Sequence, residues 1–146
     1  MPGSIYRAHP RGRRKRPLSP VQPASGSDDW RRCAAEYRRL LDDAAGVGLF
    51  HEPDWSRGVY HLFVATTERR DRLIDHLRAA GVGTGIHYPI PLHLQRAYQH
   101  LGYKAGDFPV AERLSEQVIS LPMYPQLTPD QQSKVAREIV RGSEER

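Results

Sequence analysis

The chain has 146 residues and a single cysteine, and it contains no run of the ~18 consecutive apolar residues that a membrane-spanning helix needs. Its length fits one domain, and the lone Cys33 excludes an internal disulfide and favours a reducing, cytoplasmic location. The formal net charge is +5, but residues 1–27 carry six basic side chains and no acidic ones. The remaining 16 basic and 17 acidic residues nearly cancel, so the rest of the chain gives no electrostatic reason to expect nucleic-acid binding.

Residues 1–27 also hold five prolines, three glycines and four serines, with no periodic apolar pattern. Such a segment cannot bury enough apolar surface to offset the entropy lost on ordering, so we expect a disordered basic tail. Its basic run, 11–16, could contact nucleic acid, although a solvated tail is the favoured interpretation. The folded domain is then expected over 28–146.

The first half of that domain predicts one helix and one strand. Apolar side chains recur at helical spacing over about 29–45, and Gly46 and Gly48 end the helix. The segment 59–65 is short, β-branched and aromatic, with apolar groups on both faces. That pattern predicts a strand in the centre of a sheet.

A helix over about 68–80 and a strand over 82–88 follow, and the prolines at 89 and 91 stop the strand. A short helix is expected over 92–101. We then expect a helix over about 108–117, with Val110, Ala111, Leu114 and Val118 facing inward.

The chain is predicted to close with a third strand, 118–121, and a last helix. Thr128, Pro129 and Gln131 have the spacing of a capping box and predict a helix that runs to about 141. The elements together predict an α+β fold: a small three- to four-stranded, mainly antiparallel sheet with helices packed on it.

Three familiar kinds of site receive little support. Cys33 lies on an apolar helix face, so it is interpreted as a core residue and not a nucleophile. His87, His93 and His100 could converge on zinc, but no acidic residue is placed as a partner and no i, i+4 histidine pair exists. The glycine-rich run 81–85 follows a helix and opens a strand, the reverse of a phosphate-binding loop.

The best candidate is the corner where the strand 82–88 meets the two prolines. His87 and Tyr88 would point to opposite faces if the backbone stays extended, so one of them could meet a ligand. Two rings with polar tips at a stiff strand end suit a hydroxylated or phosphorylated small molecule. A Tyr-Pro turn that covers the sheet edge is the structural alternative, and it stays open.

Several stretches carry a family resemblance. They are 81–103, which includes Gly-Thr-Gly-Ile-His-Tyr-Pro-Ile-Pro at 83–91, then 106–112 and 119–128. The segments 30–41 and 60–64 precede them in the same order. Over about 28–141 the chain resembles the C-terminal small domain of the DegT/DnrJ/EryC1/StrS family, the pyridoxal-phosphate-dependent sugar aminotransferases.

The resemblance implies a fold type I aminotransferase, in which a large cofactor domain precedes this small domain and the enzyme works as a homodimer. It implies transfer of an amino group from an amino acid, commonly glutamate, to a nucleotide-linked keto sugar. Deoxysugar, antibiotic or polysaccharide biosynthesis would use the product. His87 and Tyr88 would then be substrate-binding residues that approach the nucleotide sugar.

The resemblance also implies a lysine that forms a Schiff base with pyridoxal phosphate, located in the large domain. Lys15, Lys104 and Lys134 are the lysines of this chain, and none has the family's sequence context. We therefore expect no catalytic residue here, no cofactor bound by the chain alone, and activity only as part of a longer enzyme or as a complementing subunit. A non-catalytic binding or regulatory module, perhaps contacting nucleic acid through the tail, is the alternative.

Overall fold

The computed structural model of the chain describes residues 25–144. Its elements in chain order are α1 (Ser25–Leu41), β1 (Gly48–Leu49), β2 (Phe63–Thr66), α2 (Arg70–Ala79), the 3-10 helices η1 (Leu92–Leu94) and η2 (Arg96–Leu101), α3 (Pro109–Gln117), β3 (Val118–Leu121) and α4 (Pro129–Glu144). The tail expected over 1–27 lies outside the described residues, apart from its last three, which begin α1. Within 25–144, no helix is long and apolar enough to cross a membrane.

The sheet has three antiparallel strands in the order β1-β2-β3. Phe63 pairs with Leu121, and Gly48 pairs with Thr66, so β2 is the central strand as its two apolar faces predict. The α+β class and the antiparallel sheet are thus confirmed. The strand begins at Phe63 and not at residue 59, because Tyr60 adopts a positive φ of 54° and its hydroxyl bonds to the Glu52 carboxylate.

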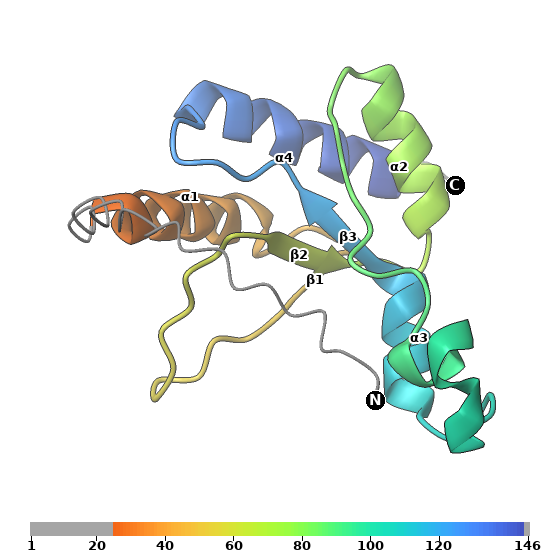
Figure 1. Ribbon diagram of the computed structural model, residues 1–146. Coiled ribbons are helices and arrows are strands. Elements are labelled where there is room, and N and C mark those ends of the chain that lie inside the picture. Colours follow the sequence, from red (N-terminus) through yellow and green to blue (C-terminus); the bar gives the residue numbers. More distant parts are fainter. Residues whose placement is uncertain (1–24, 145–146) are drawn as a thin grey trace, which may run out of the picture.

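The core lies between the sheet and three helices. Figure 1 shows α4 running beside α1 and close to α2, over the strands. Tyr37 of α1 is fully buried; its ring lies 5.1 Å from that of Phe63, and its hydroxyl donates to the Pro122 carbonyl at 2.9 Å. Gln132 of α4 donates to the carbonyl of Cys33 at 2.7 Å. The expected core role of Cys33 agrees with its 1% exposure.

The strand predicted over 82–88 does not form. Only Gly85 pairs with β3, through two backbone hydrogen bonds to Ser120 of 3.0 and 2.8 Å. Pro89 and Pro91 have no N–H to extend a ladder, so the chain touches the sheet at one residue and leaves it.

The expected inward face of the helix at 108–117 is wrong for Val110 and Ala111, whereas Val118 is buried as expected. Val110 is 58% exposed, Ala111 is exposed and Leu114 is half-buried, while Ser115 is the buried residue of α3. Figure 1 shows α3 and the short helices gathered at one end, apart from the layer of α1 and α4. Val110 and Ala111 of α3 therefore face outward.

The start of α4 confirms the capping box. Gln131 N–H donates to Thr128 Oγ1 at 3.3 Å, and Thr128 N–H donates to Gln131 Oε1 at 2.9 Å. These bonds satisfy two backbone groups that a helix start leaves without partners. The helix therefore begins where the sequence predicts, although it extends to Glu144.

We expect Thr128→Ala to lower the free energy of unfolding by about 1 kcal/mol, because the first turn of α4 loses its side-chain acceptor. Thr128→Ser keeps the hydroxyl and serves as the matched control. Urea unfolding followed by circular dichroism measures both variants. Equal losses in the two variants would contradict a capping role.

Candidate functional site

The predicted corner is anchored to the sheet edge by backbone pairing. Ser120 N–H donates to Gly85 O at 2.8 Å, and Gly85 N–H donates to Ser120 O at 3.0 Å. Ser120 is 3% exposed and lies in β3 opposite Val64 of the central strand. The chain therefore leaves a fixed point of the core just before it reaches the two candidate rings.

His87 is held against this anchor by its own ring. Its Nδ1 lies 2.9 Å from Ser120 Oγ. The ring also packs over Gly85, where an added Cβ would lie 2.8 Å from His87 Cε1. A residue with a side chain at position 85 would occupy the space that the imidazole fills.

Tyr88 extends from the corner into solvent. Tyr88 is 71% exposed, and its hydroxyl has no hydrogen-bond partner in the described part of the chain. Its ring meets that of His87 edge to face, with centroids 5.7 Å apart and planes at 76°. The expected opposite orientation is therefore not found, because the backbone bends at His87. Both residues are exposed, so one ligand could touch both rings.

The histidines considered for zinc have separate partners. His93 Nε2 lies 2.9 Å from Glu112 Oε1, and His100 Nδ1 lies 3.1 Å from the carbonyl of Ala97, while His87 bonds to Ser120. Between residues 25 and 144, no group of three or more histidine, cysteine or acidic side chains is placed to hold a metal ion.

Glu112 organises a second feature near the corner, and sequence reasoning missed it. Its carboxylate accepts hydrogen bonds from the N–H groups of Gly106 at 2.9 Å and Phe108 at 3.2 Å, besides contacting His93. The Gly106 bond above all lowers the pKa of Glu112. An acidic residue in the first turn of a predicted helix is the signal that could have identified this role.

The loop that Glu112 organises borders an apolar hollow of about 330 Å³. The ring of Phe108 lies 4.8 Å from His93 and 5.2 Å from Tyr103. The hollow is lined by Leu92, His93, Tyr98, Leu101, Tyr103, Phe108 and Ala111. Its walls offer almost no polar groups, so it suits an apolar group better than a sugar or a phosphate.

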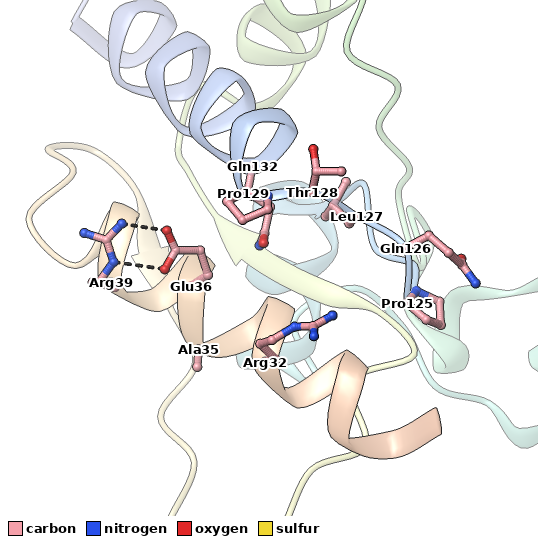
Figure 2. A pocket seen from close by; sticks show the side chains of 10 residues that line it. All are labelled: Arg32, Ala35, Glu36, Arg39, Pro125, Gln126, Leu127, Thr128, Pro129 and Gln132. Carbon is pink, nitrogen blue, oxygen red and sulfur yellow. Dashed lines mark hydrogen bonds and ion pairs between the residues drawn. The ribbon is translucent and has the colours of Figure 1, made fainter. Parts of the chain in front are cut away.

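A larger hollow, of about 740 Å³, lies between α1 and the segment before α4 (Figure 2). Figure 2 shows the Arg39 guanidinium bonded through two nitrogens to the Glu36 carboxylate, at 2.6 and 3.0 Å. Arg32, on the same rim, pairs with Asp29 at 3.2 Å. The charged groups on this rim already pair with each other, so the hollow is a weaker candidate than the corner.

Neither described lysine fits a Schiff base with pyridoxal phosphate. Such a site needs an enclosed lysine, an acidic partner for the pyridine nitrogen and donors for the phosphate. Lys104 lies in an exposed loop, and Lys134 lies on the exposed side of α4. The hollow of about 280 Å³ beside Lys134 has no acidic side chain in its lining. Lys15 lies outside the described residues.

Comparison with known proteins identifies the chain's relatives. Residues 27–140 match the model of the DegT/DnrJ/EryC1/StrS aminotransferase family, and this span contains the corner, the Glu112 loop and most of α4. The chain belongs to this family. The resemblance carried by 81–103, 106–112 and 119–128 is thereby confirmed.

Curated relatives share substantial identity with the chain. The erythromycin biosynthesis sensory transduction protein EryC1 of Saccharopolyspora erythraea is 43% identical over 80% of this chain and 33% of the relative. A dTDP-3-amino-3,4,6-trideoxy-alpha-D-glucose transaminase of Streptomyces venezuelae is 43% identical over 70% of this chain and 27% of the relative. The chain thus spans about a third of the length of the curated relatives it matches.

Solved structures agree with the fold. The crystal structure of S. venezuelae DesV, described as a complex with a ketimine intermediate, matches 84% of this chain and 33% of the DesV chain, with 39% identity and a TM-score of 0.78. The putative sugar aminotransferase Spr1654 of Streptococcus pneumoniae, in its PMP form, gives a TM-score of 0.73 at 24% identity, which supports the fold alone.

We expect Gly85→Ala to displace the His87 ring, because the new methyl group would lie 2.8 Å from Cε1. Gly83→Ala is the matched control, since a Cβ at position 83 meets nothing within 4 Å. The ring-proton chemical shifts of His87 measure the displacement. Unchanged shifts in a folded Gly85→Ala protein would contradict the packing described above.

The Glu112 loop should respond to acid. Because the pKa of Glu112 is lowered in the folded protein, its contribution to stability is present above the unfolded pKa and is lost as pH falls through the folded pKa. We expect the amide signal of Gly106 to titrate with a midpoint below the ordinary value of 4.5. Glu112→Gln should abolish that titration and Glu116→Gln should leave it; a midpoint at or above 4.5 would contradict the bonding.

Proposed function

We propose that the chain supplies the small domain of a pyridoxal-phosphate-dependent sugar aminotransferase, in which His87 and Tyr88 contact a nucleotide-linked keto sugar. The observation that carries the proposal is the exposed ring pair on an anchored corner, inside the span that matches the family. The name of the Streptomyces venezuelae relative, a dTDP-amino-sugar transaminase, supports the same substrate class.

The corner offers the kind of groups that such a substrate needs. The Tyr88 hydroxyl has no partner within the described chain, and the imidazole edge of His87 remote from Ser120 is not bonded by any described residue. Both can form hydrogen bonds with sugar hydroxyls or phosphate oxygens. Two anchored rings would orient the sugar while chemistry proceeds on residues of another domain.

The amino-transfer step is assigned to a cofactor domain outside the described residues. Neither Lys104 nor Lys134 lies where it could serve, so we infer that the chain alone forms no Schiff base with pyridoxal phosphate. The domain would act within a longer polypeptide, or as a separate subunit docked on a cofactor domain, in a homodimeric enzyme of the cytoplasm. An amino acid such as glutamate would supply the amino group.

The outward apolar groups at the end of the molecule support such docking. Leu92, Leu101 and Val110 are 65%, 55% and 58% exposed, which is unusual for large apolar side chains gathered in one region. A cofactor domain that covered α3 and the short helices would remove this surface from water. Docking of a cofactor domain would thereby explain why Val110 and Ala111 of α3 face outward.

Co-expression tests the proposal. The Streptomyces venezuelae transaminase, deleted of the 27% of its length that this chain matches, is produced with the full 146-residue chain, and amino transfer to a dTDP-linked keto sugar is measured. We expect restored activity, and a loss of about tenfold in kcat/KM for Tyr88→Phe, because one hydrogen bond to substrate is removed.

Tyr124→Phe, a change of the same kind outside both the corner and the proposed docking surface, is the control and should keep the activity of the unaltered chain. The chain alone, mixed with pyridoxal phosphate, should develop no absorbance band that borohydride removes. Such a band, or a complex whose activity ignores Tyr88→Phe, would refute the assignment.

A further inference from the structure

Ser120 is the one side chain in the described structure that bonds to the ring of His87. It is buried at 3% exposure, and its backbone N–H and C=O are both engaged by Gly85. Its hydroxyl has no hydrogen-bond partner among residues 25–144 other than His87 Nδ1, at 2.9 Å. The direction of this bond decides which imidazole nitrogen carries the proton.

Two arrangements of the neutral pair are possible. If Nδ1 carried the proton and donated to Ser120 Oγ, the buried hydroxyl proton of Ser120 would have no acceptor. If the hydroxyl donates to an unprotonated Nδ1, no buried donor lacks a partner. An unmet buried donor costs more than an unused lone pair on an oxygen, so the second arrangement is favoured about tenfold or more.

We propose that Ser120 is a positioning residue: its hydroxyl donates to Nδ1 and holds His87 in the tautomer that carries the proton on Nε2. The exposed edge of the ring then presents an N–H donor to the ligand. The Nε2–H group would donate to an oxygen acceptor of the ligand, such as a phosphate or sugar oxygen. This hydrogen bond needs no positive charge on His87.

This inference rests on the proposed function where it names the ligand, but the tautomer itself does not. Gly85 adds the second constraint, because the absence of a Cβ admits the ring against β3. Ser120 fixes the rotation of the imidazole, and Gly85 allows the ring to lie close to β3. Both act through His87 and touch no substrate.

The test reads the two ring nitrogens of His87 directly. The full 146-residue chain is labelled with ¹⁵N, and long-range ¹H–¹⁵N correlation spectra are recorded about two units above the ordinary imidazole pKa of ~6.5. His87→Gln assigns the signals by their loss. We expect a pyridine-like Nδ1 and a pyrrole-like Nε2 in the unaltered chain.

Ser120→Ala should lower the preference for the Nε2–H tautomer about tenfold, so the Nδ1 and Nε2 shifts move toward each other. The backbone pairing of residue 120 with Gly85 does not need the side chain, so the variant should fold. Ser120→Thr keeps the hydroxyl and should restore the shifts. Ser115→Ala removes another buried serine, bonded to the Glu112 carbonyl, and should leave His87 unchanged.

A proton on Nδ1 in the unaltered chain overturns the proposal. So does a Ser120→Ala protein with a native amide spectrum and unchanged His87 nitrogen shifts. The measurement contains no substrate. Its failure therefore leaves the co-expression result standing, and failure of the co-expression experiment leaves the tautomer assignment standing.

Discussion

The two backbone hydrogen bonds between Gly85 and Ser120 are the contact on which the corner depends. In the described chain, they are the only backbone pairing between the sheet and the segment that connects α2 to η1. β3 itself is fixed by full burial, since Ile119 and Leu121 on either side of Ser120 belong to the core. Rigidity therefore passes from the packed core to Ser120, from there to Gly85, and so to the imidazole that rests on both.

The neighbouring region around α3 is built on a different principle. Around α3, polar contacts replace burial: one carboxylate, Glu112, collects two backbone N–H groups and the His93 ring. The apolar side chains there line an open hollow or face solvent. In the proposed enzyme, a cofactor domain would cover this region, which holds its shape by hydrogen bonds and leaves its apolar groups outside. That the chain spans a third of its relatives' length fits this interpretation.

Local signals in the sequence predicted the local structure well. The capping box at Thr128 and the helical spacing of α1 and α4 depend on neighbouring residues, so the sequence alone determines them. The central strand was identified for the same reason, because its two apolar faces require covering on both sides. Two rings with polar tips at a stiff strand end make His87 and Tyr88 candidates for ligand binding, and the family resemblance implies that the ligand is a nucleotide sugar.

The features that failed are those that depend on distant partners. The strand at 82–88 needs a neighbour along its whole length, and the structure gives it one residue, Ser120. Val110 and Ala111 of α3 are expected to face inward because apolar residues usually do, but both are exposed. Ser120 carried no signal at all, since a serine in a short strand has no special spacing. Its role exists only through a contact across 33 positions of sequence.

The corner and the region around α3 have linked consequences for catalysis in the proposed enzyme. His87 and Tyr88 are placed by the core of this domain, whereas the reacting lysine would belong to another domain. The distance between them would then be set by how the apolar end around α3 docks, and not by the corner itself. Because a displacement of about 1 Å at a reacting centre can cost ~100-fold in rate, that docking must be reproducible. A broad apolar face, held in shape by the hydrogen bonds to Glu112, meets this requirement better than a few flexible surface charges. Such charges would allow the two domains to dock in several alternative positions.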